Sequence, residues 1–164
     1  MLSAGLKKTI ALETETLEVH QEFLSPDEYI EFLSRTDLGS QYPKEDFRER
    51  IAILVKSVPV SLVVRNSRRT IVAVCFAITD FAYWQFVTDL GVARDYVRKG
   101  LGRELLRLAH ELCGGEKRII QYLCANEDAI DFYLKAGMER ADDIMRLSKV
   151  DWTEFTVGAD HGDQ

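Results

Sequence analysis

A strand that leads through a glycine-rich, cationic turn directly into an amphipathic helix is the feature that most limits how this chain can fold. The strand is predicted for Tyr83–Val92, which is rich in aromatic and β-branched residues, and the turn is Arg98-Lys99-Gly100-Leu101-Gly102. The helix that follows carries one apolar stripe, formed by Leu101, Leu105, Leu108 and Leu112. This order of elements is typical of a domain that combines a sheet with helices.

The glycine turn also favours binding of an anion. Backbone N–H groups are unpaired at a helix N-terminus, where the helix dipole is positive, and glycines let the backbone approach a ligand closely. Arg98, Lys99 and Arg103 add positive charge, and Arg94 is expected to join the same basic cluster around the turn. The segment lacks both the Lys-Ser/Thr of a P-loop and the third glycine of a dinucleotide fingerprint. A phosphate site and a plain glycine turn that starts a helix therefore both remain open.

The rest of the chain predicts further strands and helices around the same sheet. Ser25-Pro26-Asp27-Glu28 has the residues of a capping box and starts a helix that ends before the loop at Asp37–Pro43. The other expected helices are Lys44–Lys56 and a short one between Asn126 and Gly137; the other expected strands are Thr16–Phe23, Val58–Arg65, Thr70–Thr79, Arg118–Leu123 and Asp143–Val150. The order β-α-α-β-β-β-α-β-α-β indicates an α/β or α+β domain around one mixed sheet.

Length and charge limit the other possibilities. The 164 residues suit one domain, which we expect over residues 16–156, with an N-terminal extension at 1–15, a flexible tail at 157–164 and fraying over the first dozen residues. With 21 Lys and Arg against 27 Asp and Glu, the net charge of −6 makes nucleic acid a poor first choice of partner and mildly favours cationic ones.

The sequence also indicates a location. It shows no secretory signal and no apolar run near the ~20 residues of a membrane helix, so no membrane association is expected and the cytoplasm is the expected location. Cys75, Cys113 and Cys124 have no paired metal-ligand spacing, so no metal is expected and the thiols are interpreted as buried and free.

Two segments of this chain resemble sequence motifs of a known family. Residues 90–106, LGVARDYVRKGLGRELL, resemble motif A of the GNAT N-acetyltransferase superfamily, and residues 126–138, NEDAIDFYLKAGM, resemble its motif B. The resemblance covers roughly Thr16 to Val150 and implies a mixed, mostly antiparallel central sheet flanked by helices. It also implies that acetyl-CoA lies where two parallel strands splay apart, here Tyr83–Val92 and Arg118–Leu123.

The same resemblance implies roles for individual residues. Backbone groups around Leu90, Gly91 and Val92 would pair with the pantetheine arm, with a bulge at Gly91 and the Leu90 N–H facing the thioester oxygen. Asn126 would bond the pantetheine, cap its helix, or do both. The pyrophosphate would lie on the turn residues Val97, Arg98, Lys99, Gly100, Leu101, Gly102 and Arg103. Val97 stands where the family usually has Gln or Arg, so a side-chain phosphate contact is lost there unless Arg98 supplies it.

Tyr133 matches the family's frequent general acid, which protonates the departing thiolate, and it would also contact the cofactor. The base is less defined, because Phe86 stands where some members have Glu. Alternation places Trp84, Phe86, Thr88 and Leu90 on one face and turns Asp89 away unless a bulge intervenes. Other candidates for the base are His20, Glu22 and Glu31; a water-mediated base or an acceptor supplied as free amine is the alternative.

The expected function is transfer of an acetyl group from acetyl-CoA to a primary amine of a small molecule or peptide. Substrate contacts are expected from Tyr29, Tyr83, Trp84 and Thr88, although the aromatic rings could equally belong to the core or to a dimer contact. Family members commonly pair through strand edges or the C-terminal segment, so a homodimer is an expected assembly. A non-catalytic acyl-CoA-binding or regulatory module is the alternative that Phe86 and Val97 keep open; a nucleotide-binding protein fits less well without the P-loop residues.

Overall fold

The computed structural model of this protein describes residues 6–38, 42–152 and 155–157. Six strands form one sheet in the sequential order β1-β2-β3-β4-β5-β6, and every neighbouring pair is antiparallel except β5–β6, which is parallel. The strands are β1 Lys7–Ala11, β2 Thr16–Gln21, β3 Val60–Arg65, β4 Ile71–Thr79, β5 Trp84–Val92 and β6 Ile120–Leu123. The expected mixed, mostly antiparallel sheet with one parallel pair is confirmed.

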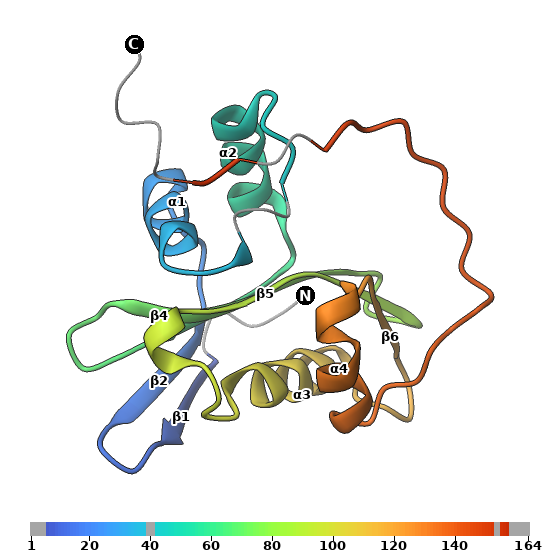
Figure 1. The fold of residues 1–164 in the computed structure, drawn as a ribbon. Helices are drawn as coiled ribbons and strands as arrows, with labels where there is room; N and C mark the ends of the chain where they lie inside the picture. Colours follow the sequence, from blue (N-terminus) through green and yellow to red (C-terminus); the bar gives the residue numbers. More distant parts are fainter. Residues whose placement is uncertain (1–5, 39–41, 153–154, 158–164) are drawn as a thin grey trace.

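Within the described part of the chain, four α-helices and two single turns of 3-10 helix connect the strands. The α-helices are α1 Pro26–Ser34, α2 Phe47–Ser57, α3 Leu101–Cys113 and α4 Ile130–Lys135, and the 3-10 turns are η2 Arg94–Tyr96 and η3 Glu127–Ala129. The α1 helix starts as the sequence predicts: the Ser25 hydroxyl accepts from the Glu28 N–H, and the Ser25 N–H donates to the Glu28 carboxylate. The α1 and α2 helices cover one face of the sheet, and α3 and α4 the other (Figure 1).

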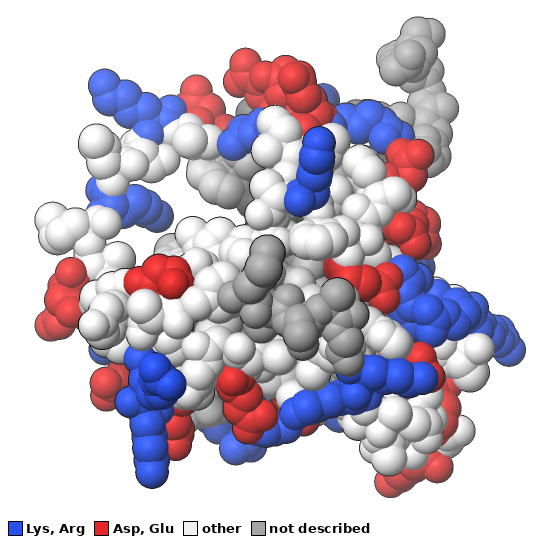
Figure 2. All heavy atoms as spheres, turned by 180° about the vertical axis from the view of Figure 1, so that it is seen from behind, with Lys and Arg blue, Asp and Glu red and all other residues white. Residues whose placement is uncertain are grey.

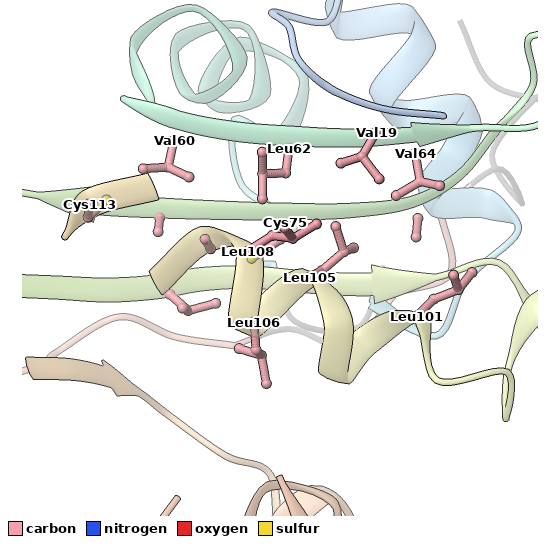
Figure 3. Packing of buried hydrophobic residues seen from close by; sticks show 14 of the residues in the cluster. Val19, Val60, Leu62, Val64, Cys75, Leu101, Leu105, Leu106, Leu108 and Cys113 are labelled. Carbon is pink, nitrogen blue, oxygen red and sulfur yellow. The ribbon is translucent and has the colours of Figure 1, made fainter. Parts of the chain in front are cut away.

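Two apolar cores follow from this layering. On one face Leu101, Leu105 and Leu108 of α3 pack against strand residues such as Leu62 and Cys75 (Figure 3). On the other face Tyr29, Phe32 and Leu33 of α1 join a second cluster with residues of α2, β3 and β4. The central strands β3 and β4 are buried on both faces, which explains their nearly continuous runs of apolar residues.

The two ends of the domain differ from the expectation. Lys7–Ala11 forms β1, within the segment expected to fray, because a short turn closed by the Leu12 N–H and the Glu15 carbonyl pairs it with β2. The expected strand Asp143–Val150 is absent: the segment is exposed and unpaired, and residues 139–150 run outside the body (Figure 1). Alternation had indicated extended backbone, but nothing in the sequence supplied a pairing partner. Val157, assigned to the tail, is buried, and 158–164 lie outside the described residues.

The face seen from behind in Figure 2 carries charged side chains of both signs, many of them around its rim. Basic and acidic residues are interspersed there, and neither sign forms a continuous surface. Among the described residues, no helix has the length and apolar character that crossing a bilayer requires.

Candidate active site

The parallel strands β5 and β6 separate halfway along β5. Their pairing runs from Trp84 opposite Ile120 to Val87 opposite Leu123, where β6 ends. Beyond Val87, β5 continues to Val92 and pairs only with β4 on its other side. The edge of β5 from Thr88 to Val92 is therefore left open, as expected for a splayed pair.

A buried glutamine holds the two strands together before they separate. The Gln85 amide is 1% exposed and donates to the Ala109 carbonyl of α3 at 2.8 Å, while its oxygen accepts from Gln121 of β6 at 2.7 Å. Gln121 also donates to the Leu106 carbonyl at 3.1 Å. These bonds tie β5 and β6 to α3, so the position at which the gap opens is fixed by satisfied buried polar groups.

A bulge in β5 changes the direction of the side chains at the gap. The register with β4 shifts between Ala77, opposite Val87, and Phe76, opposite Asp89, which leaves Thr88 as the extra residue. Before the bulge, Gln85 and Val87 face α3; after it, Leu90 does so and Asp89 faces the α1–α2 side. The expectation that the bulge lies at Gly91 is wrong, and the simple alternation that turned Asp89 away fails for the same reason.

Gly91 is needed instead for a close approach of the α1–α2 loop. A Cβ atom at Gly91 would lie 2.1 Å from Cδ1 and 3.0 Å from Cγ of Leu38, and 3.5 Å from the Phe32 ring. Gly91 has no positive φ. Its role is to make room for Leu38 beneath the strand.

A small cavity lies in the gap between β5 and β6. Its walls come from the second half of β5, the end of β6 and the start of α4: Val87, Thr88, Asp89, Leu90, Leu123, Cys124, Asn126, Ala129 and Tyr133. Asn126 precedes η3 but its side chain makes no capping bond, so the amide is available to a ligand. Cys124 is exposed and lines this cavity, which corrects the expectation of a buried thiol; Cys75 and Cys113 are buried as expected.

Tyr133 projects from α4 into the same cavity. Its hydroxyl has no hydrogen-bond partner among the side chains and backbone that the structure describes. Burial raises the pKa of this phenol above its ordinary value, so the hydroxyl is protonated at neutral pH. Tyr133 can therefore donate a proton to a group in the cavity.

The glycine turn lies at the N-terminus of α3. Arg98 and Gly100 have positive φ, at 62° and 79°, and α3 then begins at Leu101 without a side-chain cap. The first N–H groups of α3 are thus without capping partners from a side chain. Val97, Arg98, Lys99 and Arg103 are exposed, and within residues 6–38, 42–152 and 155–157 none of the three cations forms an ion pair. This arrangement fits a pyrophosphate.

Arg94 is not part of that turn, although it is close in sequence. Its guanidinium donates to the Asp37 carboxylate at 3.0 Å and to the carbonyls of Ser34 and Thr36 at 3.1 and 2.8 Å. Arg94 therefore fastens the segment after β5 to the end of α1. The prediction that it joins the basic cluster is wrong.

Gly102 and Leu101 have packing roles within the turn. A Cβ atom at Gly102 would lie 3.1 Å from the Phe132 ring of α4, so this glycine allows α3 and α4 to approach. The Leu101 side chain is buried in the core below the sheet. Only their backbone N–H groups can therefore contribute to an anion site.

A second, larger groove opens on the α2 side of β5. It has a volume of about 280 Å³ and is lined by Tyr42, Pro43, Arg50, Leu54, Thr88, Asp89, Val150 and Trp152. Thr88 and Asp89 line both this groove and the cavity between β5 and β6. The bulge thus forms a wall shared by the two spaces.

Asp89 is the centre of a buried polar cluster. Its carboxylate is 5% exposed and accepts hydrogen bonds from the hydroxyls of Tyr42 and Thr88, the latter at 2.7 Å. The hydroxyls of Tyr42 and Tyr29 lie 2.7 Å apart. Burial raises the pKa of Asp89, and the hydroxyl donors partly oppose this effect. The pKa of both tyrosines is raised, mainly by burial and to a smaller extent by nearby groups that include Asp89. Both hydroxyls therefore stay protonated and can donate hydrogen bonds.

The structure separates the residues that were expected to contact the acceptor. Thr88 lies at the shared wall, but Tyr29 is fully buried beneath Tyr42, and the hydroxyls of the two tyrosines lie 2.7 Å apart. Tyr83 and Trp84 lie at the start of β5, outside the lining of both spaces, where Trp84 stacks on Tyr122 of β6. A substrate contact from Tyr29, Tyr83 or Trp84 is not supported by these positions.

The other candidate bases are engaged elsewhere. His20 lies 3.0 Å from Glu18, Glu22 pairs with Arg65 at 2.5 Å, and Glu31 pairs with Arg35 at 2.7 Å. Sequence analysis missed Arg50 and Trp152 as groove residues, and considered Asp89 only in the event of a bulge. The one signal for Asp89 was a single charged residue within a strand that carries no other charge, since a buried carboxylate is costly without a partner.

A sequence model described as the acetyltransferase (GNAT) family matches residues 20–138. No curated protein matches the chain at a significant level.

Solved structures share the fold at low sequence identity. A GNAT-family acetyltransferase from Streptococcus pneumoniae is 16% identical, with a TM-score of 0.62, over 82% of this chain and 96% of that one. Glucosamine-6-phosphate N-acetyltransferase from Arabidopsis thaliana is 18% identical, with a TM-score of 0.58, over 83% and 99%. An aminoglycoside N-acetyltransferase in complex with CoA is 9% identical, with a TM-score of 0.60, over 85% and 99%.

Proposed function

Because the chain belongs to the acetyltransferase (GNAT) family, we propose that it transfers the acetyl group of acetyl-CoA directly to a primary amine of a small molecule or peptide. The observation that carries the proposal is the open edge of β5 beyond the end of its pairing with β6. The cavity at this edge is also lined by Asn126 and Tyr133. The groove on the other side of Thr88 and Asp89 gives an acceptor its own access.

The open edge and the glycine turn suit the two ends of the cofactor. Backbone groups of Leu90, Gly91 and Val92 are proposed to pair with the pantetheine arm, as an added strand would, and Asn126 to bond the same arm. The N–H groups of residues 98–103 are proposed to hold the pyrophosphate, with Arg98, Lys99 and Arg103 adding charge. Val97 contributes backbone only, and the exposed Arg98 beside it is free to supply the side-chain contact.

Two groups of the chain would act on the reacting atoms. Bound acetyl-CoA supplies an acetyl thioester that an amine can attack. The Leu90 N–H is proposed to stabilise negative charge on the thioester oxygen. Tyr133, whose pKa is raised by burial, is proposed to protonate the sulfur as the C–S bond breaks. Among the described residues no group of three or more His, Cys, Asp or Glu side chains is arranged to hold a metal ion.

The test combines CoA binding with release of CoA thiol in the presence of an amine panel. Tyr133→Phe removes only the hydroxyl, so turnover should fall about 100-fold while CoA affinity, measured by calorimetry, stays within about twofold. Tyr122→Phe is the matched control, because Tyr122 stacks on Trp84 away from the cavity, and it should leave turnover unchanged.

Each other result has a defined meaning. Full turnover in Tyr133→Phe would remove that residue from the mechanism. CoA binding without thiol release from any amine would favour the non-catalytic acyl-CoA module. Absence of CoA binding would overturn both functions.

The same proposal includes a cytoplasmic location and assembly as a homodimer. Three free cysteines support a reducing compartment. The edge position of β6 and the exposed apolar side chains of Ile144, Met145 and Leu147 support pairing of two copies. Light scattering at several protein concentrations measures the assembly, and a monomer throughout would refute it.

A further inference from the structure

We propose, resting on the acetyltransferase function above, that the groove beside α2 is the acceptor site, that Asp89 binds the amine and receives its proton, and that the acceptor is a monoamine with an apolar body. The cluster around Asp89 lies outside both segments that resemble the family motifs.

Asp89 is a buried carboxylate without a positive partner. It is 5% exposed, its bonds come from the hydroxyls of Tyr42 and Thr88, and it forms no ion pair with any residue in the described part of the chain. Burial of a lone negative charge is expensive, and hydroxyl donors compensate only part of that expense. An ammonium group in the groove would supply the missing positive charge.

Asp89 is also placed where the transfer would occur. It lines the acceptor groove and the cavity between β5 and β6, and the next residue, Leu90, has the N–H proposed to face the thioester oxygen. An amine held on Asp89 would therefore reach the acetyl group without crossing the strand. Tyr42 acts as a positioning residue, since its hydroxyl fixes the carboxylate and is itself supported by Tyr29 at 2.7 Å.

The groove walls define the body of the acceptor. Pro43, Leu54, Val150 and Trp152 present mostly apolar surface, and Tyr42 adds an aromatic ring. Among the described residues that line the groove, Arg50 is the only other charged side chain, and it forms no ion pair with another described residue. Its positive charge would repel a second ammonium group. An apolar monoamine therefore fits, and a polyamine or an aminoglycoside does not.

The transfer balances with these groups. The bound ammonium first gives one proton to the Asp89 carboxylate, which releases it through water to the solvent. The free amine then forms a C–N bond to the acetyl carbon while the C–S bond breaks; the second proton that leaves nitrogen goes to the Asp89 carboxylate, and the thiolate takes the Tyr133 proton. A proton then returns from Asp89 to the Tyr133 phenolate through water, so both groups regain their starting states. The pKa of Asp89, raised by burial, makes this carboxylate a better proton acceptor than an exposed one.

The first experiment measures thiol release with 2-phenylethylamine, spermidine and kanamycin as acceptors. For the wild-type chain, kcat/KM should be at least about tenfold higher for 2-phenylethylamine than for the other two. Asp89→Asn keeps the shape and should lower kcat/KM for 2-phenylethylamine by about 100-fold or more, with CoA affinity unchanged. Asp80→Asn, in the β4–β5 turn, is the matched control and should keep full activity.

A second variant and a binding measurement make the outcome independent of how well Asp89→Asn folds. Arg50→Glu should raise kcat/KM for spermidine about tenfold, because it converts the rim from repulsive to attractive for a second cation. Calorimetric binding of 2-phenylethylamine to the CoA complex should be lost in Asp89→Asn and kept in Asp80→Asn.

Each contrary result overturns a defined part. Activity of Asp89→Asn within threefold of wild type refutes the role of Asp89 and leaves the acetyltransferase function standing. A preference for spermidine or kanamycin refutes the acceptor class. Absence of 2-phenylethylamine binding refutes the site, and CoA binding without thiol release from any amine refutes the proposed function instead.

Discussion

The two spaces on either side of Thr88 and Asp89 are assembled in different ways. The cavity between β5 and β6 draws its walls from residues 87–90 and 123–133 and adjoins the turn before α3. The groove beside α2 draws on residues 42–54 of the α1–α2 loop and α2, on β5 and on residues 150–152, three regions far apart in the sequence. The walls of the first space thus come from two short segments of the chain, and those of the second come from three separate regions.

The difference also concerns the groups involved. On the cofactor side the polar groups are largely backbone N–H groups at a strand edge and a helix start, which many sequences can supply. On the acceptor side they are side chains, Asp89 with Tyr42 and Thr88, held by burial. Substitutions on the acceptor side should therefore alter stability more, and the following predictions test this from the largest effect to the smallest.

Gly91→Ala should be the most damaging of these changes to folding. The new methyl group would lie 2.1 Å from Leu38, which is 5% exposed and has little room to move. Overpacking of this kind should lower the free energy of unfolding by about 2–3 kcal/mol, measured by urea denaturation. In the double variant with Leu38→Ala, the combined loss should fall short of the sum of the two single losses; simple additivity would show that the contact is not the cause.

Arg94→Ala should come next, because it breaks three hydrogen bonds that hold the segment after β5 to the end of α1. The expected loss in the free energy of unfolding is about 1–2 kcal/mol, since the guanidinium is partly exposed. Arg98→Ala is the matched control on the cofactor side: it should weaken CoA binding and leave the melting temperature unchanged. Equal loss of stability in both variants would contradict the distinction between the two sides.

Asp89→Asn should stabilise the protein at neutral pH, by about 1 kcal/mol, because it removes a buried charge at a functional position. The pKa of Asp89 is raised above 3.8, so its ionisation disfavours the folded state increasingly as the pH rises from about 3.8 through the folded-state pKa. The difference in melting temperature between variant and wild type should thus be small near pH 4 and grow toward pH 7. A variant that is less stable at pH 7 would show that the carboxylate is structural.

Gly100→Ala should have the smallest effect on stability. Gly100 has a φ of 79° and nothing lies within 4 Å of the site where a Cβ would stand. The penalty is conformational only, about 0.5–1 kcal/mol by thermal denaturation. Gly115→Ala, with a φ of 81° and equally open surroundings, is the control outside the cofactor turn and should cost the same stability without reducing CoA affinity.

Much of the cofactor side could be read from the sequence because its determinants are local. The α3 stripe, the glycine turn and the capping box at Ser25 depend on residues a few positions apart, and the structure contains all three. The expected strand Asp143–Val150 failed for the opposite reason: a strand needs a partner, and no local pattern specifies one. Strand β1 was missed for a related reason. Its five residues lack the alternation of apolar and polar side chains that predicts a strand, and they are ordered by pairing with β2.

What the sequence determined by itself was the order of the elements between Thr16 and Lys135, the family resemblance and the residues of the cofactor turn, because spacing along the chain sets helix faces and helix starts. The tertiary structure decided which side of β5 each residue occupies. One extra residue at Thr88 turns Asp89 toward the α1–α2 side and brings it to Tyr42, 47 positions away. A side-chain period of two is reversed by a single bulge, and a bulge depends on the register with the neighbouring strand rather than on the strand's own residues.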